Sequence, residues 1–107
     1  MILMALVQLS TAQVRESRDV SNFDEISISS AFIVELSVGA VESLEVEAEE
    51  RYIEDIETEV RNGRLNIRLR DSRNTRRMRN SPRLYVTVKS LKYIGISGAV
   101  KLTTFDP

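Results

Sequence analysis

One short pattern occurs twice in this chain. Residues 26–31 read ISISSA and residues 94–99 read IGISGA. The likeness extends backwards through two further pairs of apolar residues, Val20/Val88 and Phe23/Leu91. A pattern that recurs at a fixed offset predicts a duplicated or stacked β-unit, because small residues after each strand let the chain turn and neighbouring layers approach closely. The repeat therefore constrains the architecture and says little about chemistry.

Apolar and polar residues alternate with a period of two along almost the whole chain after residue 12, and few windows keep a helical period. This alternation predicts half-buried strands and an all-β fold. We expect strands at residues 16–20, 25–29, 32–38, 43–48, 56–61, 64–70, 84–88, 93–97 and 100–103. The one helical candidate covers residues 49–56.

The pair Asn62-Gly63 predicts a tight β-hairpin, because a two-residue type I′ turn needs positive φ at both positions. Pairing around this turn produces a largely apolar face, with the pairs Val60/Leu65, Thr58/Ile67 and Ile56/Leu69. On the other face Glu57 lies opposite Arg68. Such an exposed ion pair sets the register more than it stabilises the fold.

The first residues read MILMALVQLSTA, a run too short to span a bilayer. Small side chains at Ser10 and Ala12 fit the pocket of a signal peptidase that cleaves before Gln13. We interpret residues 1–12 as the remnant of a signal peptide and residues 13–107 as one β-domain, exported to the periplasm, the outer-membrane surface or the medium. No Lys or Arg precedes the apolar run, so the alternative of a buried N-terminal strand in a cytosolic protein stays open.

The amino-acid composition excludes most of the common catalytic mechanisms. The chain has no His and no Cys, and so lacks the commonest general base, the usual zinc ligands, thiol nucleophiles and disulfides. Neither a Gly-x-Ser-x-Gly nor a Ser-x-x-Lys element occurs. The formal net charge of -1 provides no general attraction to nucleic acid. We expect no catalytic residue, no cofactor or metal site, no transmembrane span and no specific nucleic-acid partner.

Alternation lapses between residues 71 and 83, where the sequence DSRNTRRMRNSPR predicts a mobile polar loop. Guanidinium groups on such a loop can bind phosphate, sulfate or uronate groups. The candidate ligand-binding residues are its arginines, Arg73, Arg76, Arg77 and Arg79. In the alternative interpretation the loop arginines only keep the tip soluble, while the neighbouring strand arginines pair with acidic strands: Arg64, Arg68 and Arg70.

An acidic stretch contains the one arrangement that suggests catalysis. Alternation places Glu45 and Glu47 side by side on one strand face, an arrangement found in the carboxylate pair of a glycosidase or in a calcium site. The alternative is a solvated strand face. Tyr85 and Tyr93 fit strand packing, with a sugar-binding platform as their alternative.

The chain also carries an ordered series of segments at residues 18–26, 31–36, 42–48, 56–67, 85–88 and 94–99. This series resembles the auto-transporter adhesin "head GIN" domain family. The resemblance implies an exported bacterial protein with a right-handed β-solenoid fold and further Ser-Gly-rich repeats downstream. Those repeats are absent from this sequence, so we expect the N-terminal part of such a solenoid, truncated at its C-terminus.

Together these features predict a non-enzymatic exported module of the cell envelope or surface, which binds a surface glycan, an envelope polymer or a protein. One alternative is a fragment of a carbohydrate-active enzyme that uses Glu45 and Glu47. Another is a polyanion-binding module that acts through the arginine-rich loop.

Export of the full chain from a bacterial host should release a product that begins at Gln13 and melts cooperatively as a β protein. Intact-mass measurement, far-UV circular dichroism and a thermal melt test this. An uncleaved product would contradict the interpretation of residues 1–12 as a signal peptide.

Overall fold

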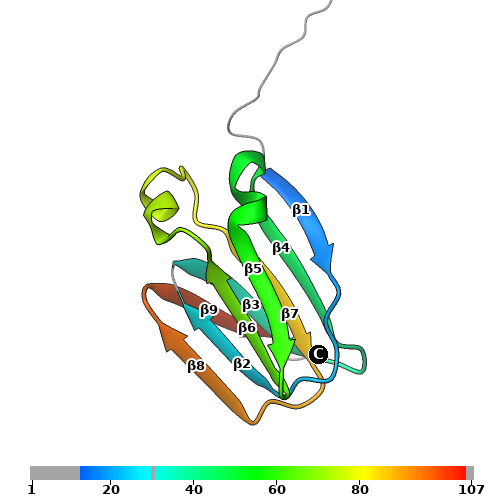
Figure 1. Ribbon diagram of the computed structural model, residues 1–107. Coiled ribbons are helices and arrows are strands. Elements are labelled where there is room, and N and C mark those ends of the chain that lie inside the picture. Colours follow the sequence, from blue (N-terminus) through cyan, green and yellow to red (C-terminus); the bar gives the residue numbers. More distant parts are fainter. Residues whose placement is uncertain (1–12, 30, 106–107) are drawn as a thin grey trace, which may run out of the picture.

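Two β-sheets make up the structure, a computed structural model that describes residues 13–29 and 31–105 (Figure 1). The five-stranded sheet has the order β1-β4-β7-β3-β9 and the four-stranded sheet the order β5-β6-β2-β8. The strands are β1 (Gln13–Arg18), β2 (Glu25–Ser29), β3 (Phe32–Val38), β4 (Ser43–Glu49), β5 (Ile56–Arg61), β6 (Arg64–Leu69), β7 (Arg83–Val88), β8 (Tyr93–Ser97) and β9 (Val100–Phe105). Two 3-10 helices complete the described elements, η1 (Glu50–Asp55) and η2 (Ser72–Arg76).

The expected right-handed β-solenoid is wrong, although the all-β class is correct. Both sheets are mixed: β1 pairs with β4, β4 with β7 and β5 with β6 in antiparallel fashion, whereas the pairs that include β2 or β3 are parallel. A solenoid stacks successive coils in parallel. A hairpin turn instead reverses the chain within one sheet, so β5 cannot continue a parallel stack.

The repeated pattern corresponds to strands that lie side by side. β2 and β8 pair in parallel, with Ile26 opposite Ile94 and Ile28 opposite Ile96. The strands that follow, β3 and β9, also pair in parallel in the other sheet. On its opposite side, the β2–β3 layer pairs with β6 and β7 (Figure 1). The two copies therefore form neighbouring layers of the same two sheets.

The Asn62-Gly63 hairpin is confirmed. Asn62 has φ 52° and Gly63 has φ 78°, the positive values that a type I′ turn requires. The register of β5 and β6 is the expected one throughout, from Arg61 opposite Arg64 to Glu57 opposite Arg68. The turn geometry that Asn62-Gly63 favours therefore predicted the register of β5 and β6 correctly.

β2, β3, β5 and β8 have the expected bounds, and β4, β6, β7 and β9 differ from them by one or two residues at one end. Two elements differ more. The helical candidate at residues 49–56 is the 3-10 helix η1. β1 covers residues 13–18 instead of 16–20 because its course is set by antiparallel pairing with β4. Arg18 links these elements: its Nη1 donates to the carbonyl oxygen of Ile56 at 2.8 Å and its Nη2 to that of Ile53 at 3.1 Å.

The hydrophobic core lies between the sheets and consists of the inward-facing members of the alternating strands. Leu65, Leu84, Val46 and Val88 are fully buried at its centre. No helix within residues 13–29 and 31–105 is long and apolar enough to cross a membrane. The signal-peptide interpretation of residues 1–12 lies outside the described residues.

Ile67→Ala should lower the free energy of unfolding by about 2–5 kcal/mol, because Ile67 is 1% exposed and its truncation leaves a cavity in the core. Val41→Ala is the matched control, since Val41 is 74% exposed and its truncation should cost no more than about 0.5 kcal/mol. Urea denaturation measures both. Equal effects would contradict the placement of the core.

Candidate functional site

The arginine-rich loop joins β6 to β7 and contains the 3-10 helix η2. Asp71 caps this helix, since its side chain accepts a hydrogen bond from the backbone N–H of Arg73 at 3.0 Å. Asp55 holds the same end of the loop. Its Oδ2 accepts from the side-chain amide of Asn74 at 2.9 Å and from the backbone N–H of Asp71 at 3.3 Å. The start of the loop is therefore tied to the end of η1.

A buried carboxylate holds the second half of the loop. Glu49, at the end of β4, has no exposed surface. Its Oε2 accepts a hydrogen bond from the backbone N–H of Arg79 at 2.6 Å and a longer one from that of Asn80 at 3.4 Å. Its Oε1 has no hydrogen-bond partner and lies 3.6 Å from Nη2 of Arg51. The loop that we expected to be mobile is thus anchored through its backbone at two places.

The four candidate arginines differ in their partners. Arg73 forms an ion pair with Asp71, with 3.0 Å between Nε and Oδ1. Hydrogen bonding to Arg73 lowers the pKa of Asp71 below its usual value, and the same contact raises the pKa of Arg73. Arg76, Arg77 and Arg79 are exposed, and none of them forms an ion pair with another described residue. Among the described residues these three guanidinium groups therefore have no carboxylate at ion-pairing distance, although the charge of Arg77 contributes to lowering the pKa of Asp71 and its Nη1 donates a hydrogen bond to Oδ1 of Asn74 at 3.5 Å.

The strand arginines, in contrast, are paired. Nη2 of Arg64 lies 2.9 Å from Glu25, and Arg68 and Arg70 bind the two carboxylate oxygens of Glu57 at 2.8 and 3.0 Å. The hydrogen bond from Arg70, followed by that from Arg68, lowers the pKa of Glu57. The pairing of Arg64, Arg68 and Arg70 with acidic strands, which the alternative interpretation of the arginines predicted, is confirmed.

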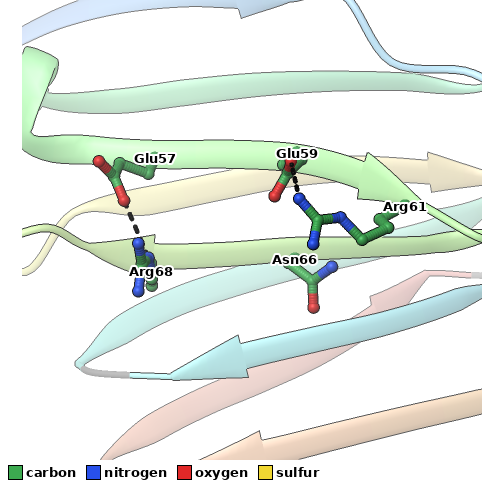
Figure 2. Close-up of a pocket in the computed structure, with 5 residues that line it drawn as sticks. All are labelled: Glu57, Glu59, Arg61, Asn66 and Arg68. Atoms are coloured by element: carbon green, nitrogen blue, oxygen red, sulfur yellow. Dashed lines mark hydrogen bonds and ion pairs between the residues drawn. The ribbon is translucent and has the colours of Figure 1, made fainter.

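Figure 2 shows a shallow depression on the outer face of the β5–β6 hairpin, with a volume of ≈ 470 Å³. Its lining consists of Glu57, Glu59, Arg61, Asn66 and Arg68. Glu57 pairs with Arg68, and Glu59 with Arg61 at 3.0 Å (Figure 2). Every charge in this depression already has a partner, and none of the candidate loop arginines lines it.

Glu45 and Glu47 lie on the outer face of the five-stranded sheet, each bound to a different neighbour. Oε1 of Glu45 accepts from Nε of Arg15 at 2.7 Å, and Oε1 of Glu47 accepts from the hydroxyl of Tyr85 at 2.6 Å. The guanidinium of Arg15 stacks 3.8 Å from the centre of the Tyr85 ring. This arrangement is a polar network across three strands. Among the described residues no group of three or more acidic side chains could hold a metal ion.

Sequence reasoning missed this network because the first strand was expected to start at residue 16, which leaves Arg15 outside it. The alternation of β4 does place Glu45 and Glu47 on one face of the strand. Which strands lie beside β4, and so which side chains these carboxylates meet, follows only from the order of strands in the sheet. Within the network, the hydrogen bond to the Glu47 carboxylate, assisted by burial, raises the pKa of Tyr85.

The two tyrosines differ in how far their rings are covered, and Tyr93 is 49% exposed. Arg15 covers Tyr85. The ring of Tyr93 lies against Gly95, where an added Cβ would come within 2.7 Å of the Tyr93 hydroxyl, and Arg64 stands 4.9 Å from its centre. A glycine at this position of the repeat thus makes room for the Tyr93 ring.

The profile of the family described as "Putative auto-transporter adhesin, head GIN domain" matches residues 22–106. The chain belongs to this family. The resemblance found in the ordered segments is therefore confirmed, and the family description is that of an adhesin. No curated protein matches the chain.

Solved structures share the fold of this head GIN domain. A "putative adhesin" from Bacteroides fragilis superposes with a TM-score of 0.76 at 16% identity, covering 90% of this chain and 44% of that one. One from Parabacteroides merdae gives 0.73 at 11% identity, with 89% and 39% covered. A "Putative lipid binding protein" from Parabacteroides distasonis gives 0.66 at 22% identity, with 85% and 41% covered. The chain spans less than half the length of these proteins, and at such identities the likeness shows the fold alone.

Glu47→Gln should lower the pKa of Tyr85 towards its ordinary value, because the amide no longer holds the phenol proton with a negative charge. The raised pKa means that the hydrogen bond stabilises the fold below the unfolded-state pKa of tyrosine, and that this contribution is lost as the pH rises through the folded-state pKa. Absorbance titration of phenolate in a Tyr52→Phe/Tyr93→Phe background isolates the group. Glu45→Gln is the matched control, and an equal shift there would contradict the assignment.

Proposed function

We propose that this head GIN domain is a non-enzymatic, exported module of the cell envelope or surface that binds an anionic glycan or envelope polymer through its arginine-rich loop. The adhesin description of the family and of its structural neighbours supports a binding role. The same description, together with the apolar first residues of the chain, supports export and a place at the surface.

The main support for this proposal is which arginines have an ion-pair partner and which do not. Ion pairs within the described residues occupy the strand arginines and Arg73, whereas Arg76, Arg77 and Arg79 have none. An incoming sulfate, phosphate or uronate group would bind these three without breaking an existing pair. Hydrogen bonds of this type, in which both partners are charged, are roughly twice as strong as neutral ones.

The anchoring of the loop supports the same role. Glu49 accepts a hydrogen bond from the backbone N–H of Arg79 and Asp55 accepts one from that of Asp71, so the loop backbone is held on either side of Arg76 and Arg77. A loop that is already ordered loses less conformational entropy on binding than a free one. The buried carboxylate of Glu49 thus acts as a positioning residue for the exposed cations.

Two observations favour binding of a saccharide polymer over binding of a nucleic acid and over a carbohydrate-active enzyme. The loop sequence between residues 71 and 83 has no aromatic side chain on which a nucleic-acid base could stack. The carbohydrate-active enzyme has less support, because Glu45 and Glu47 bind Arg15 and Tyr85 and do not face each other across a cleft.

The triple variant Arg76→Gln/Arg77→Gln/Arg79→Gln should weaken binding to heparin, a sulfated glycan, by about tenfold or more, since it removes several charge-assisted hydrogen bonds. Isothermal titration calorimetry measures the affinity. Wild-type binding should also fall as NaCl is added, because the interaction is electrostatic.

The matched control removes the same charge elsewhere, in Arg61→Gln/Arg64→Gln/Arg68→Gln, whose arginines are ion-paired. Its affinity for heparin should stay within about threefold of wild type. The proposal fails if wild type does not bind heparin, or if both triple variants lose the same affinity.

A further inference from the structure

A cavity lies on the outer face of the five-stranded sheet, where the second half of the arginine-rich loop returns to β7. Four strands and the loop line it, through Gln13, Ile33, Glu47, Asn80, Ser81 and Arg83. Its volume is ≈ 290 Å³, close to the lower limit of about 300 Å³ for small-molecule sites. The loop and the start of β1 are at the same end of the molecule (Figure 1). Since Asn80 directly follows Arg79, the cavity adjoins the loop arginines that we propose bind anionic groups.

The sheet side of the cavity is a row of paired residues across three strands. Glu47 of β4 pairs with Arg83 of β7, which pairs on its other side with Ile33 of β3. Tyr85 donates to Oε1 of Glu47 at 2.6 Å, and Nη1 of Arg83 donates to Glu35 at 3.3 Å. Each charged group of the row is thereby fixed in place and retains further hydrogen-bonding capacity. The row offers a ligand a carboxylate acceptor, guanidinium donors and one apolar side chain.

The loop side of the cavity is held at both ends. Oε2 of the buried Glu49 accepts a hydrogen bond from the backbone N–H of Arg79 at 2.6 Å. The carbonyl oxygen of Pro82 accepts one from the backbone N–H of Ile33 at 2.9 Å. Residues 80–81, which line the cavity, lie between these two anchors. The cavity is therefore pre-formed, and a ligand that enters it orders little additional backbone.

Three hydrogen-bonding side chains around the cavity are unused. Gln13, Asn80 and Ser81 are exposed, and none of their side chains makes a hydrogen bond within the part of the chain that the structure describes. Two amides and a hydroxyl present both donors and acceptors, which the hydroxyl groups of a sugar require. A second anionic group is disfavoured here, because Glu47 would repel it. The lining of the cavity therefore differs in chemistry from the loop arginines.

We propose that this cavity binds one sugar unit through its hydroxyl groups, as a subsite next to the anion-binding loop. The subsite depends on the proposed function, and it narrows the ligand to an anionic polysaccharide: a charged group binds the loop arginines while a neighbouring ring occupies the cavity. A polyanion without sugar rings would use the loop alone. The cavity thus provides selectivity among polymers of similar charge.

Isothermal titration calorimetry with heparin and with polyphosphate, a polyanion that has no sugar ring, tests the subsite. Wild type should bind heparin about tenfold more tightly than polyphosphate, because only heparin forms hydrogen bonds in the cavity. The cavity variant Asn80→Ala/Ser81→Ala should lose about tenfold in affinity for heparin and stay within about threefold of wild type for polyphosphate. Its anchors involve backbone groups and Glu49, which these substitutions leave in place.

Two further variants separate the cavity from the loop and from the rest of the surface. Ser27→Ala/Asn66→Ala is the matched control, since these residues pair on the outer face of the other sheet, and it should bind heparin within about twofold of wild type. The triple loop variant Arg76→Gln/Arg77→Gln/Arg79→Gln should weaken binding of both polyanions, because both use the loop.

Nuclear magnetic resonance provides a readout that does not rely on a variant. The side-chain amide signals of Gln13 and Asn80 should shift when heparin is added and stay unchanged with polyphosphate. A cavity variant that binds heparin as tightly as wild type, or a matched control that loses as much affinity, would overturn the subsite. A wild type with no preference for heparin over polyphosphate would overturn it too. In each of these cases a loss of heparin binding in the triple loop variant would leave the role of the loop standing, whereas a wild type that does not bind heparin at all would overturn both.

Discussion

The parallel pairing of the β2–β3 layer with neighbours on both sides is the constraint on which the structure depends. β2 lies between β6 and β8, and β3 lies between β7 and β9. Ile26, Ile28, Phe32 and Val34 of this layer are almost completely buried. Strands that are covered on both edges and on one face can hold only one register, because a slip of one residue would turn the apolar set outward. The flanking layers take their positions from this one.

The carboxylates on the two sheets and those near the arginine-rich loop bind different kinds of partner. Over the strands, arginines and carboxylates alternate across neighbouring strands and pair with each other, as Arg68 and Arg70 do with Glu57. At the loop, carboxylates instead bind backbone N–H groups, as Glu49 does at Arg79. Glu49 and Asp55 therefore hold the loop backbone, and of the four candidate loop arginines only Arg73 has an ion-pair partner among the described residues, namely Asp71.

The sequence predicted much of the fold and a smaller part of the candidate site. Alternation located most strands, and Asn62-Gly63 specified its hairpin because the turn geometry is local. The solenoid, which the family resemblance implied, was wrong. The repeat itself indicates only that two layers are neighbours, and it contains no information about the antiparallel strands that complete each sheet. The loop arginines could be selected by charge, but their free or paired state could not. That state depends on which carboxylates lie near the loop: Asp71 forms an ion pair with Arg73, whereas no ion pair among the described residues includes Arg76, Arg77 or Arg79.

By itself, the sequence determined the period of the strands, the type I′ turn, the relation between the two copies of the repeat and the accumulation of positive charge between residues 71 and 83. These are properties of residues close together in the chain, or of a direct comparison of two segments. Only the tertiary structure decided the order of strands in each sheet, the burial of Glu49 beneath the loop and the exposure of Ile96 where Ile28 is sealed. The physical reason is that burial and pairing depend on which segments meet in space. Two residues of the same type at the same position of a repeat can therefore differ in burial, one enclosed in the core and the other exposed at the surface.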